Sequence, residues 1–140
     1  MTEPLLSVRD LETVFHTDEG TLRAVDGISF DVARGEVVCL VGESGSGKTV
    51  TAESITRLVE TPPGEISGEV RFDGTDVLAL DDENLRALRG NRISHVFQNP
   101  QGALNPVYTV GWQLIEAIRL HEDATRRDAR ERAVTLLDRV

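Results

Sequence analysis

The sequence predicts an α/β fold, and three features carry that prediction. The segment before residue 36 is mostly β-forming, residues 37–41 form a continuous apolar run, and that run leads into a glycine-rich loop at 42–49. Beyond the loop, strand-like and helix-like segments alternate, as in a sheet covered by helices. No internal repeat or low-complexity tract interrupts this order, so the sequence predicts one α/β unit.

The segments before the loop are predicted to be strands. Residues 5–8 and 22–32 have β-forming compositions, and apolar and polar side chains alternate over 28–32 with the period of a half-buried strand. After a turn at 34–36, the apolar run 37–41 predicts a strand buried on both faces. The single cysteine, Cys39, lies in this run and is predicted to be a buried core thiol.

The segments after the loop alternate between helices and strands. A helix is predicted from about residue 47 to 59, because Pro62, Pro63 and Gly64 end it. The remaining predicted elements are a strand at 69–72 with a turn at Asp73 and Gly74, a helix at 81–89 capped by Asp81 or Asp82, a strand at 93–97, a helix at 109–120, and a charged helix at 124–140 with an apolar stripe of Ala129, Ala133, Leu136, Leu137 and Val140.

Composition restricts the classes of partner. The 140 residues are 39% hydrophobic, enough for one domain with a core. A formal charge of −9, from 24 acidic and 15 basic residues, argues against nucleic acid as a partner. No apolar run approaches the roughly 18–20 residues that cross a bilayer, and residues 1–4 lack the start of a secretory signal. The sequence therefore predicts a soluble, cytoplasmic chain.

The glycine-rich loop predicts a nucleoside triphosphate site. Its residues match G-x-x-x-x-G-K-[ST] at every fixed position, and they are Gly42, Glu43, Ser44, Gly45, Ser46, Gly47, Lys48 and Thr49. Gly45 and Gly47 let backbone N–H groups surround an anion, and the start of the following helix adds positive potential. Lys48, the only lysine in the chain, supplies a charge for the β- and γ-phosphates, and the Thr49 hydroxyl can coordinate Mg²⁺. Kinases, GTPases and many ATPases share this loop.

Three stretches narrow the choice, and through them the sequence resembles the ATP-binding subunits of ABC transporters. The loop is similar to that family's G-x-S-G-x-G-K-[ST] motif, and Phe97 and Gln98 follow Lys48 by about 50 residues, as the family's Q-loop does. Residues 96–106 are similar to the F-Q-x-P-x-x-[SA]-L-N-P segment of the dipeptide, oligopeptide and nickel importers. Residues 24–30 and 47–52 resemble the same subgroup.

The resemblance implies further site residues. Phe15 lies nine positions before Ala24, where the family has an aromatic residue that stacks on adenine; an ordinary core aromatic is the alternative. Gln98 would contact Mg²⁺ and the attacking water. Val50 replaces the hydroxyl residue of many ABC ATPases and would contact the α-phosphate through its backbone. By contrast, His16, His95 and His121 show no metal-ligand spacing.

The resemblance also implies an assembly and a fold. It implies an ATPase that energises import of peptides or nickel, at the cytoplasmic side of the cell membrane and peripheral to it. The partners would be a second ATPase subunit, identical or related, transmembrane permease subunits contacted through the Q-loop region, and indirectly a solute-binding protein. The fold would be an N-terminal antiparallel β subdomain, a partial parallel core and the start of a helical subdomain.

Several motifs of that family do not occur in the 140 residues. There is no L-S-G-G-Q-like signature, no apolar run ending in Asp-Glu (the Walker B motif), and no switch histidine. We therefore expect residues 1–140 to be a truncated nucleotide-binding domain that binds ATP weakly and does not hydrolyse it. A family strand from the missing half would lie beside residues 37–41, so its absence is expected to expose that edge. The alternatives are a non-transport ABC ATPase, a P-loop kinase or GTPase, and an inactive remnant of the family.

Overall fold

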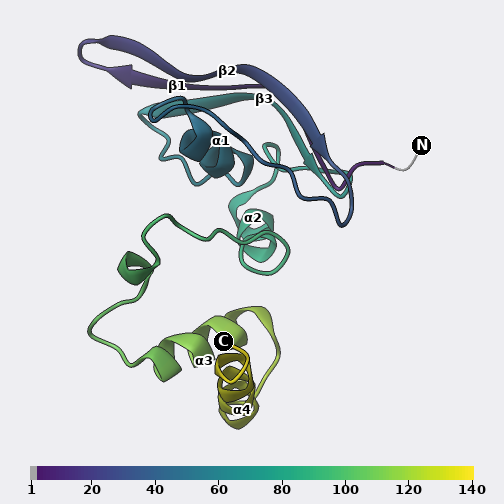
Figure 1. The fold of residues 1–140 in the computed structure, drawn as a ribbon, viewed down its shortest axis with the longest axis vertical. Coiled ribbons are helices and arrows are strands. Elements are labelled where there is room, and N and C mark those ends of the chain that lie inside the picture. Colours follow the sequence, from purple (N-terminus) through teal and green to yellow (C-terminus); the bar gives the residue numbers. More distant parts are fainter. Residues whose placement is uncertain (1–2) are drawn as a thin grey trace. The chain divides into compact units, whose positions relative to one another are not determined.

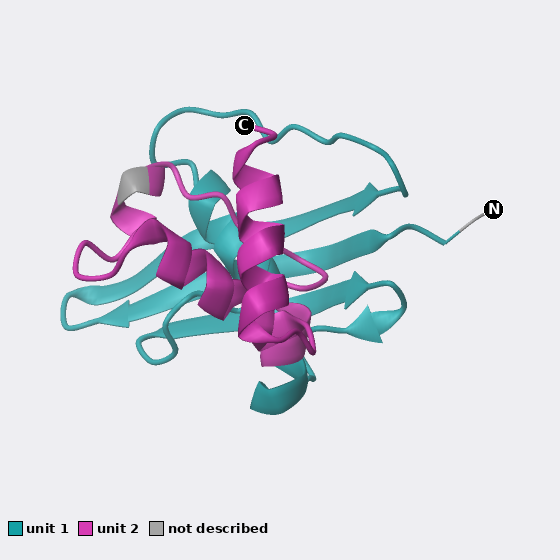
Figure 2. Ribbon diagram, turned by 90° about the horizontal axis from the view of Figure 1, so that it is seen from below, with its two compact units in different colours: residues 1–85 teal, residues 86–140 magenta. Residues whose placement is uncertain are grey.

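The chain forms two compact units in the computed structural model, which describes residues 3–140 apart from the side chain of Gln101 (Figure 2). The first unit ends at Leu85 and the second comprises residues 86–140. The first contains a β-sheet and one helix, and the second is helical with extended connections.

The first unit is built on a four-stranded antiparallel sheet in which β1 lies between β2 and β3 (Figure 1). The strands form where they were predicted, but β1 and β3 are longer than the predicted segments. Each continues for as long as a neighbouring strand pairs with it. Pairing between strands therefore sets the length of each strand, and the sequence of a single segment does not indicate how far that pairing extends. In sheet order the strands are β2 (Gly20–Val32), β1 (Leu6–Thr17), β3 (Gly64–Phe72) and β4 (Thr75–Asp76).

A tight turn joins β3 to β4 at the predicted position. Asp73 and Gly74 both have positive φ, 50° and 78°, and Phe72 pairs with Thr75 across the turn. Two consecutive left-handed residues are the geometry of a type I′ hairpin turn, which Asp-Gly favours. The turn prediction is confirmed.

The core of the first unit lies against the sheet. Val8 and Leu11 of β1 and Val70 of β3 are completely buried, and α1 (Lys48–Ile55) packs on β1 and β2. The buried positions of α1 are hydroxyl residues, Thr51 and Ser54. The helix is therefore held by polar contacts as well as by apolar burial.

The helix α1 ends one turn earlier than predicted. The N–H group of Leu58 donates to the carbonyl of Glu53, the N–H group of Arg57 donates to that of Ser54, and Arg57 has a φ of 54°. These bonds form a Schellman motif, which normally places glycine at the left-handed position. Because Arg57 occupies it here, the sequence carried no visible stop signal, and the prediction of a helix to residue 59 is wrong.

Two predicted strands are absent from the described chain. Residues 37–41 have no strand conformation, Val37 and Val41 are 88% and 91% exposed, and Cys39 is exposed rather than buried. Residues 93–97 have none either, apart from one isolated bridge between Arg89 and Ile93. A strand needs a neighbour for its backbone groups, and within residues 3–140 no strand pairs with either segment.

The predicted helices beyond residue 80 form, and the predicted cap at Asp81 is confirmed. Asp81 accepts from the N–H group of Asn84 at 2.9 Å, and Thr109 and Thr125 cap the next two helices through their hydroxyls. The helices are α2 (Asp82–Leu88), α3 (Val110–His121) and α4 (Arg126–Leu137), and a 3₁₀ turn, η1, spans Pro100–Ala103.

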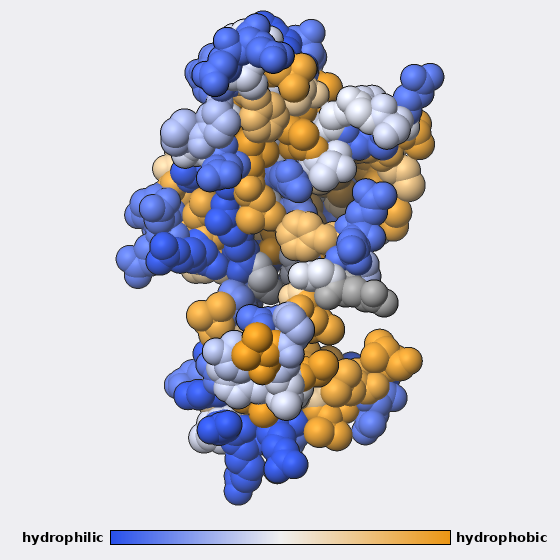
Figure 3. Space-filling model, turned by 90° about the vertical axis from the view of Figure 1, so that its left-hand side faces the viewer, coloured by the Kyte–Doolittle hydropathy of each residue, from blue (hydrophilic) through white to orange (hydrophobic). Residues whose placement is uncertain are grey.

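In the second unit, α3 packs against α4. Ala129 and Ala133 of α4 are buried, as their place on the predicted stripe required, whereas Leu136 and Leu137 are 42% and 49% exposed. Trp112 stacks on Tyr108 with ring centroids 4.2 Å apart and is 39% exposed, so it is not a core residue. On the face of the molecule that Figure 3 draws, several apolar side chains reach the surface. Among the described residues, no helix has the length and apolar character needed to span a membrane.

Candidate functional site

The phosphate loop, residues 42–49, has the backbone of an anion nest. Gly45 and Gly47 have φ values of 81° and 86°, in the left-handed region that side chains disfavour. Left-handed residues alternating with right-handed ones turn successive N–H groups toward one side. The loop is also open to solvent, because Gly42, Glu43, Ser44, Gly45 and Ser46 are all exposed.

The first turn of α1 adds N–H groups to the loop. The first hydrogen bond of the helix runs from the N–H group of Thr51 to the carbonyl of Gly47, at 2.8 Å. The N–H groups of Lys48, Thr49 and Val50 precede that bond, so the helix itself offers them no acceptor. Together with the positive end of the helix dipole, they favour an anion at this position.

The ammonium group of Lys48 is anchored on the loop. It donates to the carbonyls of Gly42 and Glu43 at 2.8 Å and 2.5 Å and to the Ser46 hydroxyl at 3.2 Å. An ammonium has three N–H donors, and all of them are directed to neutral oxygens. Anionic phosphate oxygens form stronger hydrogen bonds with an ammonium than neutral carbonyls do. A phosphate at the loop can therefore replace these contacts.

The loop lines a cavity of about 330 Å³, here called the loop cavity. The predicted aromatic residue, Phe15, lies on its wall beside Leu22, its cross-strand partner in β2. The structure thus brings Phe15 together with the loop, although 27 residues separate Phe15 from Gly42 in the sequence. The wall is formed by Phe15, Leu22, Arg23, Ala24 and residues 45–50.

Phe15 is half-buried and borders the loop cavity. On β3 it lies opposite Gly64, and a Cβ on that glycine would lie 3.3 Å from Cε1 of the ring. The ring thus covers a position without a side chain on one side and borders the loop cavity on the other. This placement favours the adenine-stacking interpretation over the core aromatic, and stacking itself stays a prediction.

Sequence reasoning missed Arg23 as a lining residue. Its guanidinium donates through Nη1 to Asp26 at 2.8 Å and to Glu12 at 3.2 Å, and these carboxylates raise the pKa of Arg23, the Asp26 hydrogen bond most. The signal was the β1–β2 pairing, which places Leu22 opposite Phe15 and Arg23 opposite Val14. That register became visible only with the hairpin in place.

The magnesium ligand predicted at Thr49 is compatible with the structure. Thr49 is exposed in the first turn of α1 and borders the loop cavity. Mg²⁺ keeps several waters and binds substrate phosphates, so one protein hydroxyl can suffice. Among the described residues, no group of three or more His, Cys, Asp or Glu side chains could hold a metal ion by itself.

Gln98 lies in the second unit, in the extended segment before η1. It is exposed and follows Phe97, whose ring stacks on His95 with centroids 6.0 Å apart. An amide on an exposed segment is available for contact with a ligand. Its role toward Mg²⁺ and water stays a prediction.

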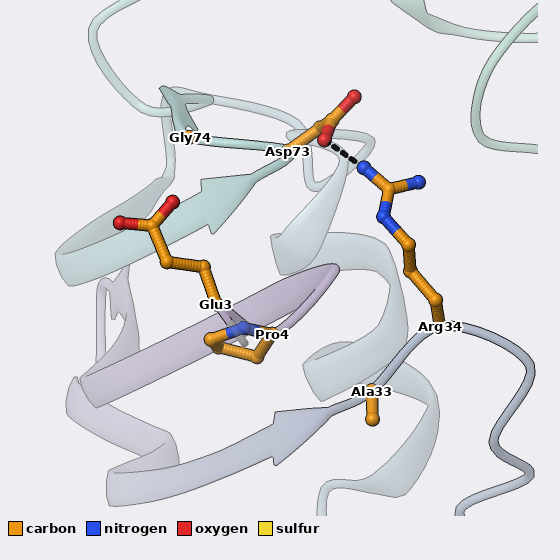
Figure 4. A pocket seen from close by; sticks show the side chains of 6 residues that line it. All are labelled: Glu3, Pro4, Ala33, Arg34, Asp73 and Gly74. Carbon is orange, nitrogen blue, oxygen red and sulfur yellow. Dashed lines mark hydrogen bonds and ion pairs between the residues drawn. The ribbon is translucent and has the colours of Figure 1, made fainter. Parts of the chain in front are cut away.

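A second cavity has the wrong electrostatics for a phosphate. It measures about 480 Å³ and lies at the end of the sheet where β2 ends (Figure 4). Arg34, its only basic residue, is hydrogen-bonded to Asp73, and Glu3 adds another carboxylate. A site with two carboxylates and one paired guanidinium disfavours anions. The smaller loop cavity is therefore the candidate site.

Comparisons with known proteins identify the family of the chain. The family model described as "ABC transporter" matches residues 25–140. A peptidoglycan transport ATP-binding protein of Agrobacterium fabrum is 51% identical over 137 residues, which are 97% of this chain and 25% of that protein. A putative peptide import ATP-binding protein of Brucella abortus is 48% identical over 139 residues, 99% of this chain and 42% of its own length.

Solved structures of ATP-binding cassettes share the fold of this chain. A dimeric ATP-binding cassette, MJ0796, in a post-hydrolysis state with ADP and Pi, superposes with a TM-score of 0.80 at 26% identity. The match covers 95% of this chain and 56% of that one, and it confirms the predicted fold class. The chain spans about a quarter to two fifths of the length of the curated relatives named above.

Proposed function

The chain belongs to the ABC transporter family, and we propose that it is the ATP-binding part of a transporter ATPase that energises import of peptides, or of nickel, across the cytoplasmic membrane. One observation carries the proposal. The loop cavity joins an anion nest at residues 45–50 to the aromatic face of Phe15, which matches a ligand with a triphosphate at one end and a base at the other.

Several residues of the loop cavity, and Gln98 outside it, have distinct tasks toward Mg-ATP. The N–H groups around Gly45 and Gly47 and at Val50 bind phosphate oxygens, and Lys48 neutralises charge on the β- and γ-phosphates. Phe15 holds adenine by stacking, which needs no hydrogen-bond code. Bound Mg²⁺ shields the triphosphate, with the Thr49 hydroxyl as its ligand from the loop. Gln98 orients water in the complete site.

The alternative nucleotide enzymes have less support. The Asn-Lys-x-Asp motif that would read guanine needs a lysine outside the loop, and Lys48 is the only one. The relatives are named for peptide or peptidoglycan transport and not for DNA repair or translation. This favours a transport ATPase over a kinase, a GTPase or a non-transport ABC protein.

The proposed function includes partners. A second ATPase subunit completes the site, since the solved relative MJ0796 is a dimer. Transmembrane permease subunits contact the region of Gln98, and a solute-binding protein delivers cargo to them. The ATPase lies at the cytoplasmic face of the membrane as a peripheral subunit.

Calorimetric titration of the purified chain with Mg-ATP tests the nucleotide site. We expect measurable binding that Lys48→Gln weakens about tenfold or more, because this variant removes the charge and leaves a neutral polar side chain one bond shorter. Arg126→Gln, which removes an equal charge from α4, is the matched control and should bind as the wild type does. Equal binding by both variants, or no binding by the wild type, would refute the site.

The 140 residues alone are proposed not to hydrolyse ATP. Positioning of water and stabilisation of transition-state charge require the signature and the Asp-Glu motif, which this sequence does not contain. Phosphate release should therefore stay at background. Release that Lys48→Gln abolishes would contradict this proposal.

A further inference from the structure

A buried hydrogen bond joins the sheet to the helix behind the loop cavity. The hydroxyls of Thr13 on β1 and Ser54 on α1 lie 2.7 Å apart, and both residues are completely buried. The Ser54 hydroxyl also lies 2.6 Å from the carbonyl of Val50, to which it donates its only hydrogen. Thr13 is therefore the donor and Ser54 the acceptor in the bond between the two elements.

This bond connects the two ends of the proposed nucleotide site. Thr13 precedes Phe15 by two residues on the central strand of the sheet, and it pairs with Val25 on one side and Ile66 on the other. Ser54 follows Lys48 by six residues on the same helix. A shift of α1 along or away from β1 would therefore move the phosphate loop relative to the ring of Phe15.

The first residue before α1, Gly47, already contacts the sheet. The Thr13–Ser54 hydrogen bond therefore holds the other end of the helix and so sets its orientation on the sheet. Gly47 approaches the backbone of β2 so closely that a Cβ would lie 2.2 Å from the carbonyl oxygen of Ala24. One end of α1 is thus held by Gly47 and the other by Ser54. No large apolar side chain of α1 is buried, so these two contacts, together with the buried Thr51, position the helix on the sheet.

We infer that the Thr13–Ser54 hydrogen bond sets the spacing between the adenine-stacking ring of Phe15 and the phosphate loop, which makes Thr13 and Ser54 positioning residues for ATP. The inference rests on the proposed function. Two hydroxyls approach to 2.7 Å, whereas the methyl group of Thr13→Val and the Ser54 oxygen need about 3.5 Å, so this variant moves α1 by roughly 0.8 Å. Ser54→Ala removes the link without such a contact and leaves α1 free to shift. A ligand that uses only the phosphate loop does not sense this spacing.

The test compares Mg-ATP with Mg-tripolyphosphate by calorimetry on the purified chain. The measured quantity is the ratio of the two Kd values, tripolyphosphate over ATP. Phe15→Ala removes the stacking ring and defines the ratio that remains without adenine contact. We expect Thr13→Val and Ser54→Ala each to lower the ratio about 5- to 10-fold, with little change in the Kd of tripolyphosphate. Thr13→Ser retains the hydroxyl and should keep the wild-type ratio.

A matched control separates positioning from loss of stability. Val70→Ala removes completely buried side-chain volume from β3 without touching the hydrogen bond, and its ratio should equal that of the wild type. An unchanged ratio in Thr13→Val and Ser54→Ala, or a ratio that falls equally in Val70→Ala, would overturn the inference and leave the nucleotide site standing. Failure of the wild type to bind either ligand would instead overturn the proposed function.

Discussion

Gly47 of the phosphate loop lies directly against the backbone of Ala24 in β2. A Cβ built on Gly47 would lie 2.2 Å from the carbonyl oxygen of Ala24, and Gly47 also has a φ of 86°. The two requirements are independent, because one concerns the conformation of the residue itself and the other the space beside it. Only glycine meets both.

Gly47→Ala should therefore destabilise the chain more than conformation alone would explain. We expect a loss of about 3 kcal/mol or more, from the left-handed strain plus the displacement of α1 from β2. Gly35→Ala is the control, since Gly35 has a φ of 75° and no atom within 4 Å of its Cβ position; it should lose about 1 kcal/mol. Urea denaturation measures both, and equal losses would show that the Ala24 contact is unimportant.

The direction of the Thr13–Ser54 hydrogen bond predicts an asymmetry in stability. Ser54→Ala leaves the buried Thr13 hydroxyl without its acceptor and should cost about 1–3 kcal/mol. Thr13→Val leaves the Ser54 hydroxyl bonded to Val50 and should cost less than about 1 kcal/mol. In the double variant, the cost of Ser54→Ala should largely disappear. A larger cost for Thr13→Val than for Ser54→Ala would mean that the donor is misassigned.

The unique lysine allows a chemical test of the loop. Lys48 carries the only side-chain amine of the chain, and it is half-buried on the phosphate loop, beside residues that are exposed. An amine-acylating reagent should modify Lys48, and Mg-ATP should slow that reaction about tenfold when it saturates the site, because phosphate oxygens then bind the ammonium. Mass spectrometry measures the extent, with the N-terminal amine of the same molecule as the control. Equal slowing at both amines would point to reagent consumption, and no slowing would argue against contact with Lys48.

The ion pair between Arg9 and Asp31 on the surface should change the titration of the Asp31 carboxyl. Asp31 accepts from Nη2 of Arg9 at 2.7 Å, and this hydrogen bond lowers the pKa of Asp31 below its ordinary value of 3.8. At pH values between the lowered pKa of the folded chain and the ordinary pKa, the unfolded chain binds more protons at Asp31 than the folded chain does. The stability that this ion pair contributes is therefore fully present above about pH 4, and it is lost as the pH falls through the pKa of the folded chain. Carbon-13 NMR of the Asp31 carboxyl should give a pKa that rises in Arg9→Gln. An unchanged value in that variant would exclude Arg9 as the cause.

Local sequence predicted those features whose cause is local. The turn at Asp73 and Gly74 formed as expected, and so did the cap at Asp81, because each depends on the backbone preference or side-chain reach of a few adjacent residues. The phosphate loop belongs to the same class, since its glycines and the following helix start are neighbours in sequence.

Features that depend on a distant partner were predicted less well. The strand at 37–41 and the buried Cys39 were inferred from composition, but a strand forms only where another strand supplies hydrogen bonds. The early end of α1 depended on Arg57 adopting a left-handed conformation, and Arg57 also donates to the carbonyl of Leu80 at 2.6 Å. Nothing in the immediate sequence of either segment signals these outcomes.

By itself the sequence determined the family and the glycine-rich loop with its single lysine, which are readable as motifs, and it predicted the Asp81 cap and the turn at Asp73 and Gly74, whose geometry follows from adjacent residues. Only the tertiary structure decided that Phe15 and Arg23 border the same cavity as the loop, and that the hydroxyls of Thr13 and Ser54 meet. The reason is physical: the register of the β1–β2 hairpin and the packing of α1 on the sheet bring together residues that no local pattern connects.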